Sequence, residues 1–373
     1  MNNNELYKRY QRQMLLKEVG EAGQQKLLQS KVLVIGAGGL GCPVLQYLAA
    51  AGVGTIGIID DDIVSITNLH RQVLYNIEDI DLPKAERAFA YLQKLNPDIK
   101  VIPYNLRLTN RNALDIINTY DIVIDGTDNF SSRYMINDAC VLSNKPLVYA
   151  AVSRFEGQVG VFNLNQKNNE KSVNYRDLFP IPPREDEVMN CSVAGVLGVL
   201  TGIIGSMQAN EAIKLITGIG EPLANRLFTY NALTNQVYEL ALAASAETGS
   251  FIPKDEAAFI NFDYEMACSA KNTFEIDAST FNSLANKENV TIIDVREFDE
   301  KPIITEFPHH HIPLNRLTEK LSALNGDILV TLCQSGGRSL QAAKMLSDTF
   351  GTSKKIYSLQ GGIVNWKNLQ QKQ

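Results

Sequence analysis

The segment from Cys333 to Leu340, CQSGGRSL, combines a thiol, two glycines and an arginine. It follows the apolar run DILVT and precedes the helix-like QAAKML. A thiol at a strand end, surrounded by backbone N–H groups and followed by a helix N-terminus, has its thiolate stabilised by oriented dipoles. Arg338 would add a full positive charge, and such settings lower a thiol pKa from about 8.5 into roughly the 3.5–7.5 range. These residues predict a reactive thiolate in an anion-binding loop.

Two classes of enzyme hold a cysteine in such a loop. Cysteine phosphatases use the spacing C-x5-R, whereas only Gln334 to Gly337 separate Cys333 from Arg338. This tighter C-x4-R loop resembles that of rhodanese sulfurtransferases, which carry a terminal sulfur on the cysteine as a persulfide. IIDVRE before the loop and LQGGIVNW after it resemble the flanking rhodanese motifs, over about residues 273–370. A buried strand cysteine would explain Cys333 alone, but not the loop and Arg338 together.

The resemblance departs from the rhodanese pattern at PIITEFPHHHIPL, where the usual Gly-His-Ile turn is replaced. This segment forms the rim of the expected site, so the identity of the persulfide donor stays open. Consecutive side chains in an extended loop do not converge readily on one ion, and we therefore expect His309 to His311 to form a solvated loop and not a metal site.

A second chemical signature lies near the start of the chain. Gly36, Gly38 and Gly41 form a G-x-G-x-x-G between the strand-like KVLVI and the helix-like CPVLQYLAAAG. The glycines let the backbone approach a phosphate, and the helix N-terminus supplies oriented N–H groups. Asp60, at the end of the next strand, is placed to accept from ribose hydroxyls. This combination alone would favour NAD.

The residues that follow favour a triphosphate instead. Cations and amides gathered near a phosphate-binding turn neutralise the charge of ATP as its α-phosphorus is attacked. Asp128, in DGTDN at the carboxyl end of a later strand, could hold Mg²⁺. Any one of these side chains could be a solvated loop charge, but together they predict an ATP site; they are Arg12, Asn68, Arg71, Gln72, Lys84 and Asp128.

The order of elements predicts an α/β protein of two domains. Apolar strands alternate with amphipathic helices through the first part of the chain, which is typical of a parallel sheet covered on both faces. We therefore expect a Rossmann-like doubly wound ATP-binding domain over residues 1–242. The composition drifts to Ala, Ser, Glu and Asp over 243–272, a predicted linker that could drape on the first domain. A smaller α/β rhodanese-like domain follows over 273–373.

The first domain resembles the ThiF/MoeB/HesA family, relatives of the ubiquitin-activating enzymes. The resemblance covers roughly residues 5–242 and rests on RYQRQ, VLVIGAGGLG, YLAAAGVGTIGIID, NLHRQVLY, PKAERA, DGTDNFSSRYMINDAC, RFEGQVGVF and CSVAGVLGVLTGIIGSMQANEAIKLITG. It implies adenylation of the C-terminal glycine of a small ubiquitin-like sulfur carrier protein that ends in Gly-Gly, with release of pyrophosphate.

The resemblance also implies roles for individual positions. The turn around Gly39 would hold phosphate, Asp60 the ribose, and Asp128 with Asn129 the metal side. Contacts to the nucleotide and its phosphates would come from Thr67, Asn68, Leu69, His70, Arg71 and Lys84.

The roles of two further residues, Arg12 and Cys191, are implied by the family resemblance alone. In this family the arm arginine, here Arg12, reaches into the partner subunit's ATP site, so a homodimer is implied. Cys191 matches the cysteine that some members use for a thioester or persulfide link to the carrier. Other members dispense with it, and a plain buried cysteine is an equally good interpretation.

Many relatives carry a structural zinc ion on two C-x-x-C pairs. At the corresponding places this chain reads NYRD, Asn174 to Asp177, and EMAC, Glu265 to Cys268, so three of the four thiolates are absent. A structural zinc ion needs four nitrogen or sulfur ligands. We therefore expect no zinc site.

Composition and charge indicate which partners and which cellular compartment to expect. The net charge of −6 and the pI of about 5.4 argue against a nucleic-acid or anionic-membrane partner. Five widely spaced cysteines do not form a secreted disulfide framework, and the first residues lack a secretory signal, so we expect a cytoplasmic protein. The uncharged run from Cys191 to Asn210 is long enough to span a membrane, but we expect a buried or subunit-contact helix from about Cys191 to Thr217.

Together the two signatures predict a sulfur-carrier activating enzyme. ATP and Mg²⁺ would activate the carrier's terminal glycine, and a persulfide on Cys333 would then give a thiocarboxylate for molybdopterin or thiamine biosynthesis or for tRNA thiolation. Two alternatives remain: a family member that activates a peptide or a tRNA base, and a carrier-binding scaffold with a degenerate rhodanese domain.

Overall fold

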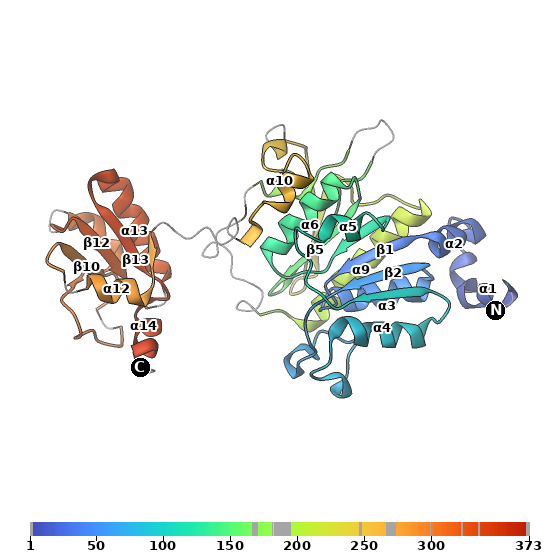
Figure 1. The fold of residues 1–373 in the computed structure, drawn as a ribbon, viewed down its shortest axis with the longest axis horizontal. Helices are drawn as coiled ribbons and strands as arrows, with labels where there is room; N and C mark the ends of the chain where they lie inside the picture. Colours follow the sequence, from blue (N-terminus) through green and yellow to red (C-terminus); the bar gives the residue numbers. More distant parts are fainter. Residues whose placement is uncertain are drawn as a thin grey trace. The chain divides into compact units, whose positions relative to one another are not determined.

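The chain forms two compact units, Met1–Cys268 and Ser269–Gln373, each with its own sheet (Figure 1). The computed structural model describes residues 3–165, 171–180, 182, 195–245, 248–265, 274–285, 287–298, 300–321, 324–334 and 336–370.

The first unit is built on an eight-stranded sheet in the order β3-β2-β1-β4-β5-β6-β7-β8. The first five strands in that order are parallel, and β5 to β8 pair antiparallel. The order reverses between β1 and β4, the switch point at which ligands bind in such sheets. The strands are β1 (Lys31–Ile35), β2 (Thr55–Ile59), β3 (Lys100–Tyr104), β4 (Ile122–Asp125), β5 (Leu147–Ser153), β6 (Glu156–Phe162), β7 (Arg226–Asn231) and β8 (Gln236–Ala241).

Helices cover both faces of this sheet, which confirms the predicted doubly wound α/β domain (Figure 1). Successive residues of a strand point to opposite faces, so β1 places Val32 and Val34 in one core and Leu33 and Ile35 in the other. The helices are α1 (Asn3–Met14), α2 (Gly20–Gln29), α3 (Gly41–Ala51), α4 (Lys84–Leu95), α5 (Ala113–Ile117), α6 (Phe130–Leu142), α7 (Tyr175–Leu178), α9 (Gly198–Thr217) and α10 (Glu256–Ile260).

The long apolar helix begins later than we expected. α9 starts at Gly198, because Val196 forms a β-bridge with Arg154 and Leu197 keeps an extended backbone. It packs on β5 and β6 through Leu200 and Ile204. Small residues permit this close approach, since a Cβ on Gly157 would lie 2.3 Å from the Ile204 side chain. No helix within the described residues is long and apolar enough to cross a membrane.

The stretch expected to be a linker, 243–272, belongs to the first unit in its described part up to Glu265. Phe259 of α10 is buried in the core beneath α6. The side-chain amide of Asn110 donates to the carbonyl oxygens of Ile260 at 2.7 Å and Phe262 at 3.0 Å. The small and acidic residues of this stretch suggested a linker, but its aromatic side chains anchor it in a core of the first unit.

The second unit is built on a parallel five-stranded sheet in the order β11-β10-β12-β13-β9. Its strands are β9 (Glu275–Ile276), β10 (Val290–Asp294), β11 (His310–His311), β12 (Ile328–Leu332) and β13 (Lys355–Leu359), and its α-helices are α12 (Ala278–Leu284), α13 (Gly337–Phe350) and α14 (Gly362–Gln370). Cores lie on both faces, with Val330 of β12 on one side and Leu329 on the other.

Two of the three residues expected to form a solvated histidine loop belong to a strand instead, although His310 is exposed. His310 and His311 form β11, paired in parallel with Ile293 and Asp294 of β10. The ring of His311 packs against Phe298 with centroids 4.8 Å apart and ring planes tilted by 53°, and its Nε2 lies 3.0 Å from the carbonyl oxygen of Arg296. Pairing with β10 therefore organises this segment.

Candidate functional site

The glycine turn at the end of β1 is held by close backbone contacts. Gly36 has φ +93°, and a Cβ there would lie 2.8 Å from the carbonyl oxygen of Gly126. A Cβ on Gly41, the first residue of α3, would lie 1.9 Å from the carbonyl oxygen of Gly36. Gly38 has more room, with its nearest neighbour at 3.6 Å. The first and last glycines thus shape the turn, and Gly38 leaves its inner face open.

A cavity of about 680 Å³ opens in front of this turn, at the carboxyl ends of β1, β2 and β4. It brings together ten of the residues expected to form the ATP site: Gly36, Gly38, Gly39, Asp60, His70, Arg71, Gln72, Lys84, Asp128 and Asn129. Gly41, Thr67, Asn68 and Leu69 do not line it. Gly41 lies behind the turn as part of α3, while Thr67 and Asn68 form the short 3-10 helix Ile66–Asn68 beside it.

Asp60 connects β2 to the glycine turn. Its Oδ2 accepts a hydrogen bond from the Ala37 amide at 2.8 Å, and its Oδ1 accepts one from the Asp62 amide at 2.9 Å. Burial raises the pKa of this carboxyl group above its usual range, against the opposing effect of Lys84. Each oxygen keeps a lone pair, so the carboxylate can still accept from a hydroxyl in the cavity.

Lys84 and Arg71, two of the cations that border the cavity, lie in different settings. Lys84 is 4% exposed, and its ammonium pairs with the exposed carboxylate of Asp62 at 2.8 Å. Arg71 is half-buried, and its guanidinium donates to the carbonyl oxygen of Thr67 at 3.0 Å and lies 2.7 Å from His70 Nε2. A buried ammonium with a single carboxylate partner keeps donors for an additional anion.

The loop after β4 supplies the acidic side of the cavity. Asp128 is exposed, and its carboxylate has no hydrogen-bond or ion-pair partner among the described residues. Asn129 caps α6 instead, since its Oδ1 accepts from the Ser132 amide at 2.9 Å. Asp128 therefore has free oxygen atoms, whereas the oxygen of Asn129 is already used.

A buried arginine that we did not predict also lines the cavity. Arg133 of α6 is 7% exposed and its guanidinium lies 5.2 Å from the ring centroid of Tyr149. Its Nε lies 3.5 Å from Oδ2 of Asp125, and neither atom makes a hydrogen bond within the described chain. Burial raises the pKa of Asp125. Arg133 stands in the quoted segment DGTDNFSSRYMINDAC, but its spacing alone does not reveal that it lines the cavity.

Two predicted residues are not in this cavity. Arg12 lies exposed on α1 and is not part of the cavity of its own chain. Cys191 lies outside the described residues, as does Cys268 of the EMAC segment. The NYRD segment places Arg176 against Asp138 of α6, with Nη2 and Oδ2 2.7 Å apart.

In the second unit, Cys333 follows β12 and is 1% exposed. Its sulfur accepts a hydrogen bond from the Gly336 amide at 3.2 Å, and α13 begins one residue later. Gly336 has φ +102°, and a Cβ there would lie 3.2 Å from the amide nitrogen of Gly361. A loop that curls around the thiol thus requires glycine at this position.

The expectation that Arg338 adds a full positive charge to this loop needs correction, because a carboxylate of the same chain pairs with it. Its Nη1 and Nη2 donate to the two carboxylate oxygens of Glu300, at 2.6 and 2.7 Å. This bond with Arg338 lowers the pKa of Glu300 to about 2. Glu300 lies 38 residues earlier, on the loop after β10, so local spacing could not identify it as the partner.

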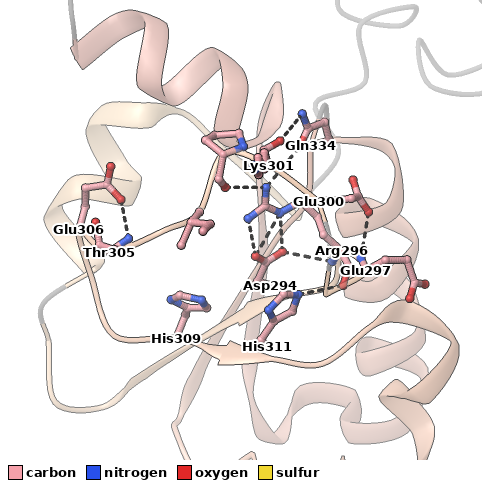
Figure 2. A network of polar contacts seen from close by, with 12 residues as sticks. Asp294, Arg296, Glu297, Glu300, Lys301, Thr305, Glu306, His309, His311 and Gln334 are labelled. Atoms are coloured by element: carbon pink, nitrogen blue, oxygen red, sulfur yellow. Dashed lines mark hydrogen bonds and ion pairs between the residues drawn. The ribbon is translucent and has the colours of Figure 1, made fainter.

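A second arginine supports the same loop (Figure 2). Arg296, of the DVRE motif, is buried and pairs with Asp294 at 2.7 Å. Its Nη1 donates to Gln334 Oε1 at 3.3 Å, and Gln334 Nε2 donates to the carbonyl oxygen of Lys301 at 2.9 Å. Figure 2 shows these side chains side by side, so the motif before Cys333 braces the residue that follows it.

The sequence matches two family models: the ThiF family over residues 10–250 and the rhodanese-like domain over 277–369. A probable adenylyltransferase/sulfurtransferase MoeZ of Mycobacterium tuberculosis is 40% identical over 375 residues, 97% of this chain and 93% of that protein. The adenylyltransferase and sulfurtransferase MOCS3-1 of Zea mays is 39% identical over 96% of this chain and 81% of its own length.

Shorter matches fall on the first unit. A sulfur carrier protein adenylyltransferase of Thermus thermophilus is 52% identical over 225 residues, 60% of this chain and 83% of that protein. Among solved structures, E. coli MccB with MccA-N7isoASN has a TM-score of 0.56 and 25% identity, over 64% of this chain and 73% of that one.

Proposed function

Because this chain belongs to the ThiF family and carries a rhodanese-like domain, it is an adenylyltransferase and sulfurtransferase, and we propose that its acceptor is the C-terminal glycine of a ubiquitin-like sulfur carrier protein. Membership of the family implies the use of ATP. The name of the Thermus thermophilus relative, sulfur carrier protein adenylyltransferase, supports this acceptor. Residues 1–242 would carry out adenylation and 273–373 sulfur transfer.

The observation that carries the proposal is the cavity at the carboxyl ends of β1, β2 and β4. A carboxylate oxygen of the carrier attacks the α-phosphorus of ATP, and pyrophosphate leaves. Backbone N–H groups of the turn around Gly39 bind phosphate, and Lys84 and Arg71 balance the negative charge that develops. Asp60 accepts from the ribose. The buried Arg133 adds a further positive charge to the same cavity.

The acidic side of the cavity fits Mg²⁺. Asp128 offers carboxylate oxygens with no partner in the described chain, and Mg²⁺ is usually held by one or two carboxylates together with substrate phosphates. When bound, the ion neutralises phosphate charge and orients the leaving pyrophosphate. Asp128 would hold it at the edge of the cavity nearest the start of α6.

Sulfur transfer would follow at the acyl-adenylate. The terminal sulfur of a Cys333 persulfide attacks the carrier's carbonyl carbon, and AMP leaves with the electron pair of the broken C–O bond. The product is an acyl disulfide on Cys333, and a second thiol then cleaves its S–S bond to release the thiocarboxylate. Each partner makes the step easier, since AMP is a good leaving group and a persulfide a good nucleophile. The thiocarboxylated carrier would serve molybdopterin or thiamine biosynthesis.

We also propose that the protein forms a homodimer. An apolar groove of about 890 Å³ runs between α3, α9 and the loop at 70–73, and it includes Tyr47, Val73 and Val199. All three side chains are exposed, and the groove shares His70 and Arg71 with the nucleotide cavity. A second copy seated on this groove would lie beside the cavity, where its Arg12 could contribute a charge.

The test is adenylation of candidate carriers. The full chain is mixed with ATP, Mg²⁺ and purified proteins that end in Gly-Gly, and the products are weighed by mass spectrometry while pyrophosphate is measured. We expect an adenylated carrier without a sulfur source and a thiocarboxylated carrier when a persulfide donor is added. Absence of both pyrophosphate and adenylate with every such carrier would contradict the proposal, and adenylation of an unrelated peptide or tRNA would replace it.

A further inference from the structure

The Arg338 guanidinium already holds an anion from its own chain. Both of its terminal nitrogens donate to Glu300, at 2.6 and 2.7 Å, in the bidentate geometry that guanidinium groups also use for external anions. Glu300 is fixed in turn, because its Oε1 accepts from the Glu297 amide at 2.9 Å. The pair therefore has no net charge, although a cation stands at the end of the Cys333 loop.

The Glu300 loop lies directly against the residues that follow Cys333. Gln334 donates to the carbonyl oxygen of Lys301 at 2.9 Å, and Arg296 Nη1 donates to both the Pro302 carbonyl oxygen, at 3.0 Å, and Gln334 Oε1. Figure 2 shows Lys301 beside Gln334 at this contact. Arg296 itself forms an ion pair with Asp294. Both arginines next to the thiol loop are thus neutralised by carboxylates of the same segment.

We propose that Glu300 is a specificity-determining residue that disfavours small dianionic sulfur donors, typified by thiosulfate, by occupying the guanidinium of Arg338 that would otherwise bind the donor's anionic group. The inference rests on the proposed role of Cys333 as the persulfide carrier. Glu300 would determine which donors can load that carrier.

The chemistry of loading explains why this pair matters. With thiosulfate, the Cys333 thiolate attacks the outer sulfur, the S–S bond to the sulfonate sulfur breaks, and sulfite leaves as a dianion with both electrons. A cation beside the loop would bind the thiosulfate dianion, whereas Glu300 adds a like charge that opposes its binding. With a persulfide donor, the leaving group is a single thiolate, which carries less charge and depends less on Arg338. The neutralised arginine therefore favours persulfide donors over thiosulfate.

The test compares donors on the full chain. Glu300→Gln keeps the shape of the side chain and removes its charge. We expect the KM for thiosulfate in thiosulfate:cyanide sulfurtransfer to fall roughly tenfold with kcat within about twofold, the signature of changed ground-state binding. Sulfite should become a stronger inhibitor by a similar factor. Loading of Cys333 by 2-hydroxyethyl persulfide, followed by mass spectrometry, should change by less than about twofold, because that donor's leaving group carries less charge.

Matched variants separate charge from loop structure. Glu306→Gln removes a comparable ion pair, with Lys367 at 2.8 Å, and should leave the KM for thiosulfate unchanged. Glu300→Asp keeps the negative charge and should keep the KM high. Adding Arg338→Gln to Glu300→Gln should cancel the gain. If Glu300→Gln does not fold, Glu300→Ala gives the same measurement.

The outcomes distinguish a failure of the Glu300 proposal from a failure of the proposed function of Cys333. An unchanged or raised KM in folded Glu300→Gln, or an equal fall in Glu300→Asp, would overturn the role of Glu300. Cys333→Ser serves as the reference for the proposed function itself. If that variant keeps the wild-type sulfurtransfer rate, Cys333 is not the carrier and the proposed function fails, whatever Glu300 does.

Discussion

Asp138 and Arg176 form a buried bidentate ion pair in the first unit. The guanidinium Nε and Nη2 lie 2.8 and 2.7 Å from the two carboxylate oxygens of Asp138. The hydroxyl of Tyr264 donates to the same carboxylate at 2.9 Å. The pair ties the NYRD segment and the residues after α10 to α6.

Removal of one partner of this pair should strongly destabilise the first unit. Arg176→Ala leaves the Asp138 carboxylate buried without its counter-ion, and we expect a loss of about 3–5 kcal/mol in the free energy of unfolding. Arg226→Ala is the matched control, because its pair with Glu239 is partly exposed and should contribute less than about 1 kcal/mol. Urea unfolding followed by circular dichroism measures both. The fluorescence transition of Trp366, in the second unit, should not move, and an equally small loss in both variants would contradict this account.

The glycine turn should not tolerate a methyl group at its closest contact. Gly41→Ala would drive a Cβ into the Gly36 carbonyl oxygen, 1.9 Å away, so the backbone must shift. We expect at least about a tenfold rise in the ATP concentration needed for half-maximal pyrophosphate exchange, since the phosphate-binding amides would be displaced. Gly249→Ala is the control, because no heavy atom lies within 4 Å of a Cβ there. Wild-type exchange in Gly41→Ala would show that the turn does not bind phosphate.

The two chemical steps should separate by mutation. Lys84→Gln and Asp128→Asn should each lower the adenylation rate by roughly 100-fold or more, because each removes charge stabilisation at the reacting phosphates. Both should leave persulfide loading of Cys333 intact, and Cys333→Ala should keep adenylation and lose thiocarboxylate formation. Lys31→Gln, at the amino end of β1 away from the cavity, is the control for charge loss. Loss of adenylation in Cys333→Ala would contradict this division.

Mixing two inactive variants would test whether Arg12 acts across a dimer. Arg12→Ala and Lys84→Gln should each be inactive in adenylation. If Arg12 serves the partner's cavity, refolding or co-expressing them in equal amounts should restore about a quarter of wild-type activity, since half of the dimers are mixed and each mixed dimer has one intact site. No recovery, with mixed dimers verified by native mass spectrometry, would show that Arg12 does not act in trans.

The Glu300–Arg338 pair should contribute to stability in a predictable pH window. An unfolded glutamate titrates near about 4.3, whereas Arg338 lowers the pKa of Glu300 to about 2 in the folded chain. A lowered folded value means that the contribution is complete above the unfolded pKa and is lost as the pH falls toward 2. Thermal midpoints from Trp366 fluorescence should therefore differ between wild type and Glu300→Gln by a constant small amount from pH 5 to 8, and converge below about pH 4. A difference that grows in acid would contradict the assignment.

Much of the site follows from local rules that a sequence displays directly. An apolar run followed by G-x-G-x-x-G predicts a strand, a turn and a helix, because steric limits at Gly36 and Gly41 act over six residues. The short gap between Cys333 and Arg338 likewise predicts a tight loop around sulfur. The alternation of strands and helices then predicts that both faces of the sheet are covered, as the cores on either side of β1 confirm.

The sequence by itself determined the backbone conformation of both sites and the types of residue that each site contains. Tertiary structure alone decided which charges meet: Glu300 with Arg338 and Asp138 with Arg176, each pair 38 residues apart, and Arg133 in the nucleotide cavity. Local sequence patterns reflect steric and hydrophobic constraints between near neighbours along the chain. Ion pairs form between segments that packing brings together, so only the folded chain reveals that the arginine beside Cys333 already holds a carboxylate.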